Sequence, residues 1–151
     1  MPSVSDAPIP ARPNAELIRM YWAACWNERR VEQLSEVFHD EYLHGRTSLT
    51  PADHAEIVRE TVASFPDLQV RIDDLEDLGE TVITRTRFMG THQGVIFGLS
   101  ATGRAIDAPS LDVFFFRGGR VARLWHLFDH LPIVRGIGAE VRIGDEVAQF
   151  D

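Results

Sequence analysis

The sequence predicts an α+β fold, with three N-terminal helices packed on a curved, mainly antiparallel sheet. Two observations predict it. Apolar residues recur at helical spacing in the first half of the chain, and at a period of two from Leu68 onward. Helices that come first and strands that follow are typical of domains in which the helices cover one face of an antiparallel sheet.

Three helices are expected before the strands begin. The first covers residues 15–27, with Asn14 as its N-cap, and the second covers residues 31–40. The third begins after Thr50, and Asp53 stands three residues later at the spacing of a capping box. These signals predict that helices fill the first half of the fold.

Four strands are expected after the helices. They cover residues 68–79, 81–92, 104–117 and 120–129. Gly118-Gly119 predicts a tight turn between the last two. In the acidic tail, Val141, Ile143 and Val147 allow an edge strand or a subunit contact, and disorder stays open as well.

The chain of 151 residues has the length of one domain. We divide it into a flexible leader (1–13), an α+β domain (14–138) and an acidic tail (139–151). The leader contains four prolines and has neither a basic start nor a long apolar run. A cytoplasmic protein is therefore expected.

Charge and composition exclude several classes of function. The formal charge of −8 and the lack of a basic run argue against nucleic acid and membrane surfaces as partners. The chain has no lysine, which excludes a Schiff-base mechanism. No histidines and acids show metal-ligand spacing, so no metal is expected. Cys25, amid apolar helical residues, is expected to be a buried, inert thiol.

A series of landmarks from the end of the third helix to the last strand carries a family resemblance. They are Phe65-Pro66-Asp67-Leu68, Gly90-Thr91-His92, Thr102-Gly103-Arg104, Trp125 and Asp129. With this spacing the chain resembles the SnoaL-like polyketide cyclases, a branch of the nuclear transport factor 2-like superfamily, over roughly residues 14 to 138. The resemblance implies a cone with an internal pocket. It also implies a hydrophobic small-molecule substrate, no cofactor and a homodimer.

In those cyclases an aspartate at the end of the last strand is the general acid/base of an aldol ring closure, and Asp129 is the residue here that matches it. Alternation places Asp129 on one face with Trp125, and His126 on the other. If Asp129 faces the pocket, its apolar neighbours should raise its pKa toward that of a general base. The alternative is a polar strand end hydrogen-bonded to the following loop. The chain departs from the family at Phe115, where an arginine or histidine is common.

The turn decides which residues join Asp129. A two-residue loop at Gly118-Gly119 puts Asp112 opposite Trp125, on the face of the acid. A three-residue loop with a bulge at Gly119 puts Phe115, with Val113 and Leu111, there instead. Apolar walls suit a polyketide-like ligand, so we favour the second register.

Other side chains are weaker candidates for ligand contact. Tyr21 lies on the first helix and could reach a ligand oxygen, although a core role is the simpler explanation. His92 could contact the ligand or fix a loop, and His44 could face the pocket. Three further histidines, His39, His54 and His130, have surface spacing and are assigned no role.

Three functions are therefore weighed. The first is a cofactor-independent enzyme that uses Asp129 as acid/base on a hydrophobic carbonyl compound, most specifically an aldol cyclase. The second is an isomerase or dehydratase like the ketosteroid isomerases, with Tyr21 as oxyanion donor and Asp40 as proton carrier. The third is a binding or dimerisation module whose cavity is filled by Phe114, Phe115 or Trp125.

Overall fold

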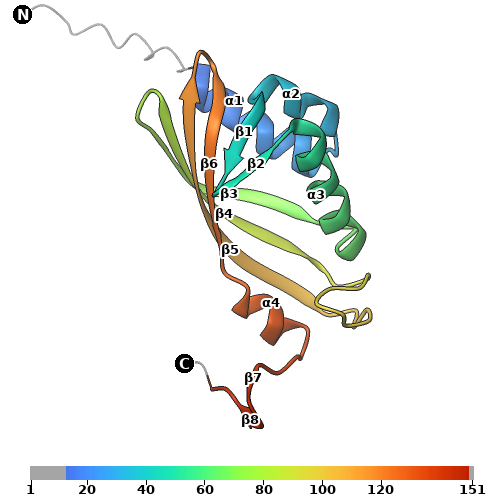
Figure 1. Cartoon of the computed structure of the whole chain (residues 1–151). Coiled ribbons are helices and arrows are strands. Elements are labelled where there is room, and N and C mark those ends of the chain that lie inside the picture. Colours follow the sequence, from blue (N-terminus) through green and yellow to red (C-terminus); the bar gives the residue numbers. More distant parts are fainter. Residues whose placement is uncertain (1–12, 150–151) are drawn as a thin grey trace, which may run out of the picture.

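A computed structural model describes residues 13–149, and the N-terminal helices lie on one face of a curved sheet (Figure 1). The expected leader lies almost wholly outside the described residues. The helical segments are α1 (Pro13–Met20), the π-helix η1 (Tyr21–Asn27), the 3₁₀-helix η2 (Val31–Gln33), α2 (Leu34–Val37), α3 (Pro51–Ser64) and α4 (Leu131–Gly136).

Six strands form the sheet, in the spatial order β2-β1-β6-β5-β4-β3. Only β1 and β6 are parallel; the other neighbouring pairs are antiparallel. The strands are β1 (Phe38–His44), β2 (Thr47–Leu49), β3 (Gln69–Asp77), β4 (Thr81–Thr91), β5 (Ala105–Arg117) and β6 (Arg120–Phe128). The expected α+β architecture with a curved, mostly antiparallel sheet is confirmed.

The first half of the chain differs from the expectation in two places. The second helix ends at Val37, and Phe38 starts a strand that pairs with β6, because this edge of the sheet would otherwise stay unpaired. Asn14 lies inside the first turn of α1, where its amide donates to the Gly79 carbonyl over 2.9 Å. The third helix is as expected, with a full capping box between Thr50 and Asp53.

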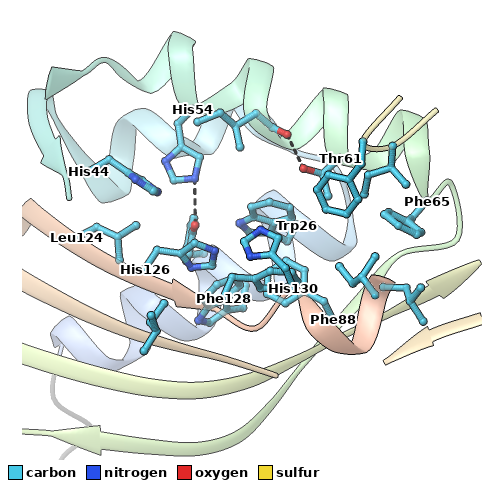
Figure 2. A pocket seen from close by; sticks show the side chains of 18 residues that line it. Trp26, His44, His54, Thr61, Phe65, Phe88, Leu124, His126, Phe128 and His130 are labelled. Carbon is cyan, nitrogen blue, oxygen red and sulfur yellow. Dashed lines mark hydrogen bonds between the residues drawn. The ribbon is translucent and has the colours of Figure 1, made fainter. Parts of the chain in front are cut away.

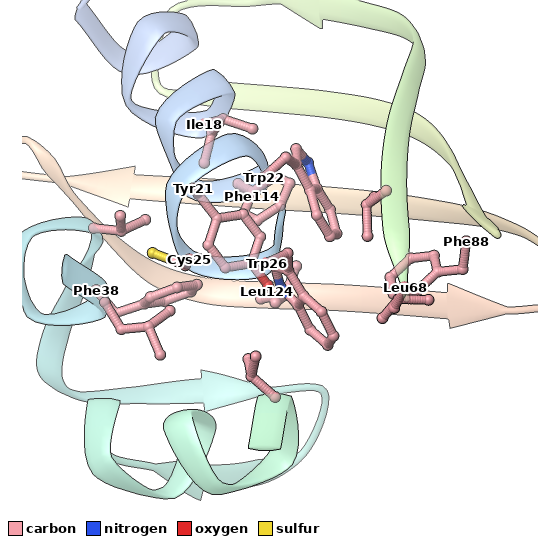
Figure 3. Close-up of a cluster of buried hydrophobic side chains, with 14 of the residues drawn as sticks. Ile18, Tyr21, Trp22, Cys25, Trp26, Phe38, Leu68, Phe88, Phe114 and Leu124 are labelled. Atoms are coloured by element: carbon pink, nitrogen blue, oxygen red, sulfur yellow. The ribbon is translucent and has the colours of Figure 1, made fainter. Parts of the chain in front are cut away.

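Aromatic side chains of η1 occupy the centre of the core, between the sheet and the other helices (Figure 3). Tyr21 and Trp22 pack edge-on against Phe114 of β5, with ring centroids 5.6 and 6.2 Å apart. Cys25 is fully buried beside them, and burial raises the pKa of its thiol to about 12. The expectation of an inert buried thiol is confirmed, since a thiol with this pKa stays protonated at neutral pH.

The β5–β6 hairpin combines features of both expected registers. Gly118 and Gly119 form a two-residue turn with positive φ at both positions, and Arg117 pairs with Arg120. The register then shifts, leaving one extra residue, Ala122, as a bulge in β6.

Beyond this bulge, Asp112 pairs with His126 and Val113 pairs with Trp125. The outer face therefore carries Val113 and Phe115, as in the favoured register. The bulge lies at Ala122 rather than at Gly119, so its expected position was wrong.

After β6 the chain forms α4 and then a small separate hairpin of β7 (Arg142–Ile143) and β8 (Glu146–Val147). The patterning did not indicate α4, and the expected tail strand pairs within the tail rather than with the main sheet. No helix in the described part of the chain is long and apolar enough to cross a membrane. The cytoplasmic location stays a prediction.

Candidate active site

A cavity of about 440 Å³ lies between the inner face of the sheet and the helices α3 and η1. Its two ends differ in character (Figure 2). Three imidazoles gather at one end. Phenyl and aliphatic side chains line the other, where His130 packs against Phe97 and Phe128 with ring centroids 6.0 and 5.1 Å apart. The polar end contains Tyr21, His44, His54 and His126, and the apolar end contains Ile57, Phe65, Phe88, Ile96 and Phe97.

The polar end is built around a buried carboxylate, Asp112 of β5. It is fully buried, and its Oδ1 lies 2.5 Å from Nδ1 of His126 on the paired strand β6. The other carboxylate oxygen accepts a hydrogen bond from the Ser110 hydroxyl, which lies 3.2 Å from that of Thr86. Buried carboxylates need such partners, because an unpaired charge costs several kcal/mol in the protein interior.

This contact fixes the chemistry of His126. A carboxylate only accepts, so the imidazole nitrogen facing it carries a proton, and Nε2 is the ring nitrogen that remains for a ligand. The His126 side chain is 28 % exposed and lines the cavity. An imidazole oriented by a buried acid and open to a cavity can serve as a general base.

Two further histidines of the polar end are held neutral. Burial and the neighbouring His126 lower the pKa of His44, whose ring lies 5.9 Å from that of His126. Burial, His44 and His126 lower the pKa of His54 to about 3. At neutral pH these rings are therefore uncharged hydrogen-bonding groups.

His54 lies between two tyrosine hydroxyls. Its Nε2 is 3.0 Å from the Tyr21 hydroxyl and its Nδ1 is 2.5 Å from the Tyr42 hydroxyl. Burial first and Asp112 second raise the pKa of Tyr21 well above its usual value, and burial also raises that of Tyr42. Both phenols therefore stay protonated.

Three residues expected at the pocket lie elsewhere. Trp125 and Phe115 lie on the outer face of the hairpin, 42 % and 38 % exposed. Asp129 is exposed and absent from the cavity lining; its carboxylate accepts a hydrogen bond from the Leu131 amide at the start of α4. The face expected to point inward thus points outward. Asp129 agrees with the alternative of a polar strand end hydrogen-bonded to the segment that follows.

Some of the other candidate residues line the cavity and others do not. Tyr21 and His44 line the cavity, as expected for ligand contacts. His92 is fully buried outside the cavity lining, and its Nδ1 lies 2.9 Å from the Thr102 hydroxyl, which favours the loop-fixing alternative. The Asp40 side chain is 98 % exposed and lies near Arg120. It therefore points away from the cavity, and the isomerase mechanism through Asp40 fails.

Sequence reasoning missed the roles of His54 and His126. The surface assignment of His54 was wrong, and the signal was present: His54 precedes Val58 by four residues and Thr61 by seven, on the inward face of α3. For His126 the alternation was right but the inward face was not. Among residues 13–149, no group of three or more His, Cys, Asp or Glu side chains is arranged to hold a metal ion.

Helices cover the curved sheet, and an apolar cavity with an oriented imidazole lies between them. These features place the chain in the class of small α+β proteins built around a ligand pocket. Within that class, the sequence profile of the SnoaL-like polyketide cyclases matches residues 16–137. The chain belongs to this family. A search of the curated proteins found no significant match.

Several solved structures share the fold of this chain. TsrD from Streptomyces laurentii is 28 % identical, with a TM-score of 0.76 over 84 % of this chain and 96 % of its own. A putative polyketide cyclase from Acidithiobacillus ferrooxidans is 23 % identical, with a TM-score of 0.76 over 85 % and 96 %. IdmH, a putative polyketide cyclase from Streptomyces antibioticus, is 24 % identical, with a TM-score of 0.74 over 83 % and 99 %. The last two likenesses concern the fold alone.

Proposed function

We propose that the protein is a cofactor-independent cyclase that acts on a hydrophobic, polyketide-like carbonyl compound, with His126 as general acid/base and Asp112 as its orienting carboxylate. The observation that carries the proposal is the 2.5 Å contact between buried Asp112 and the imidazole of His126, at the polar end of an otherwise apolar cavity.

In the proposed reaction, His126 Nε2 removes a proton from the carbon next to a ketone, and the electron pair of that C–H bond forms an enolate. The enolate carbon then attacks a second carbonyl of the same molecule, which forms the ring C–C bond and an alkoxide. The imidazolium returns its proton to the alkoxide. Asp112 stabilises the imidazolium between these steps, an arrangement that raises general-base efficiency.

The cavity supports the substrate class. A volume of about 440 Å³ lies within the range of pockets that hold drug-sized ligands. Phe65 and Phe88 give the far end flat apolar walls that suit a fused-ring or poly-carbonyl chain. The chemistry then occurs at the polar end, beside His126.

The test measures proton abstraction without the natural substrate. The α-protons of 2-tetralone, a fused-ring ketone, exchange with deuterium when a base forms the enolate, and proton NMR follows the loss of signal in D₂O. We expect the protein to catalyse this exchange and His126→Gln to lose it by about 100-fold or more, with unchanged circular dichroism. His39→Gln is the matched control, because His39 contacts the Arg117 carbonyl at the surface. Full exchange in His126→Gln would contradict the proposal.

The structure lacks the filled cavity that the binding-module hypothesis requires. That hypothesis needs Phe114, Phe115 or Trp125 to fill the cavity. None of the three lines it: Phe114 is in the core, and the other two lie on the outer face. We therefore keep it only as the outcome in which ligands bind but no exchange is catalysed.

A further inference from the structure

The enolate of the proposed reaction needs hydrogen-bond donors for its oxygen, and two donors in the cavity lack an acceptor. The Trp26 indole N–H is buried and has no hydrogen-bond partner among the described residues, although Trp26 lines the cavity. Unpartnered buried donors are rare in folded proteins. The second donor is the Tyr21 hydroxyl, whose direction depends on His54.

His54 offers only two proton arrangements, because a neutral imidazole carries one N–H. In the first, Nδ1–H donates to Tyr42 and the Tyr21 hydroxyl donates to Nε2. In the second, the Tyr42 hydroxyl donates to Nδ1 and Nε2–H donates to the Tyr21 oxygen. The low pKa of His54, about 3, excludes the doubly protonated ring at neutral pH.

The surroundings favour the second arrangement. In the first, the Tyr42 proton is left over. Tyr42 is buried, does not line the cavity, and has no second side-chain hydrogen bond within residues 13–149. In the second, the leftover proton belongs to Tyr21, which does line the cavity. A buried donor without an acceptor is disfavoured, so the spare proton belongs where a ligand can accept it.

The two free donors lie together. The Trp26 N–H is close enough to the Tyr21 oxygen to favour the ionised phenol slightly, yet without hydrogen-bond geometry. The ring of His44 lies 5.9 Å from that of His54, which contacts the Tyr21 hydroxyl, and 5.9 Å from that of His126. Tyr21 therefore lies at the same end of the cavity as the Asp112–His126 pair. Figure 3 shows Tyr21 and Trp26 on adjacent turns of η1.

We propose that Tyr21 Oη and Trp26 Nε1 form an oxyanion site that binds the carbonyl oxygen of the substrate, and that His54 and Tyr42 are positioning residues that direct the Tyr21 proton into the cavity. The inference rests on the proposed function and adds how the substrate is oriented. Its carbonyl oxygen lies at Tyr21 and Trp26, and its α-carbon faces His126. Donors preorganised at a developing oxyanion are a large source of rate enhancement.

The probe for this site is 4-nitrophenolate, an aromatic oxyanion with visible absorbance. Each donor contributes a charge-assisted hydrogen bond, so Tyr21→Phe and Trp26→Phe are expected to weaken its binding by about tenfold. Trp125→Phe is the matched control, because the Trp125 indole is 42 % exposed on the outer face and does not line the cavity. It should change the Kd less than about twofold, within the scatter of surface substitutions. Equal losses in both tryptophan variants would overturn the proposal.

NMR on the unmodified protein avoids any variant that fails to fold. Three indole N–H signals are expected from ¹⁵N-tryptophan, since the chain has three tryptophans. Saturation with 4-nitrophenolate should shift the Trp26 signal downfield and leave that of Trp22 in place. A Trp26 signal that does not move, or no binding at millimolar probe, also overturns the proposal.

The positioning role of Tyr42 has its own spectroscopic test. In the protein with ¹⁵N-histidine, the His54 shifts should report a proton on Nε2, and in Tyr42→Phe on Nδ1. Tyr42→Phe should weaken 4-nitrophenolate binding several-fold, because Tyr21 then donates to His54 instead. An Nδ1 proton in the unmodified protein would contradict this role.

His126→Gln separates the two proposals. The variant should bind 4-nitrophenolate as the unmodified protein does, because the probe already carries the charge. Loss of 2-tetralone exchange with intact probe binding supports the oxyanion site and its independence from the base. Intact exchange in a protein that does not bind the probe refutes the oxyanion site alone.

Discussion

The two faces of the β5–β6 hairpin are both rich in apolar residues and yet differ in what their polar groups do. On the inner face, Asp112 and His126 are paired, and the acid is shielded from water. On the outer face, Trp125 and Leu127 are 42 % and 71 % exposed. The nearby Asp129 is open to solvent, and its carboxylate accepts a hydrogen bond from the Leu131 amide at the start of α4. The buried acid thus has a defined partner beside a cavity, whereas the acid at the strand end is open to solvent.

The largest effect is expected from the inner acid. Asp112→Asn keeps the shape but offers an amide that can donate to Nδ1, so the free lone pair moves away from Nε2. Exchange of 2-tetralone protons should fall by about 100-fold or more. Asp107→Asn is the control on the same strand, because Asp107 lies outside and pairs with Arg87 over 2.8 Å. Equal losses of exchange in Asp112→Asn and Asp107→Asn would contradict the prediction that the inner acid has the larger effect.

The second effect concerns stability and pH. The unfolded chain protonates His54 near its ordinary pKa of 6.5, whereas the folded protein does so only near pH 3. Between these values the unfolded state binds more protons, so stability falls as the pH falls. His54 alone should lower the free energy of unfolding by about 2 kcal/mol between pH 7 and pH 5, where each unit below 6.5 contributes about 1.4 kcal/mol.

Urea unfolding at the two pH values measures this loss. His54→Gln should lose clearly less stability than the unmodified protein over the same interval, because glutamine does not titrate. His44 changes stability in the same direction, since its pKa is also lowered, so some pH dependence remains in the variant. An unchanged pH dependence in His54→Gln would show that the ring is not held neutral in the polar end of the cavity.

The sequence predicted the architecture better than the site, and the hairpin shows why. Periodicity and the capping box determine where elements lie, and α3 and the four long strands were found on that basis. Alternation also sorted β6 into two correct faces. It could not say which face is inward, because Trp125 outside is as apolar as Leu124 and Phe128 inside. The bulge at Ala122 is a local departure that no period reveals.

The outer face of the hairpin exposes several large apolar side chains. We propose that they form the contact of a homodimer, because exposed apolar patches commonly mark interaction surfaces. These are Leu111, Phe115, Trp125 and Leu127. The double substitution Trp125→Glu and Leu127→Glu should yield a monomer in sedimentation or light scattering.

Phe97→Glu is the control for that experiment, because Phe97 is 56 % exposed and lies at the cavity rather than on the outer face. It should remain dimeric. A monomeric unmodified protein at about 100 μM, well above the Kd of a stable dimer, would refute the contact.

The smallest effect is expected from Asp129, although its strand-end position made it the first candidate. A solvent-open groove of about 510 Å³ on the outer face contains Asp129 and Arg85, and its volume is large enough to admit a ligand. Arg85, however, is already paired with Asp73 and Asp74, and the Asp129 carboxylate already accepts a hydrogen bond from the Leu131 amide.

Asp129→Asn should therefore keep 2-tetralone exchange within about twofold, since a carboxylate outside the cavity contributes no proton transfer. Its Tm should fall only slightly, because the amide oxygen of asparagine still accepts from the Leu131 amide. Loss of exchange in Asp129→Asn together with full exchange in Asp112→Asn would move the reaction to the outer groove. That result would reverse the roles of the two faces.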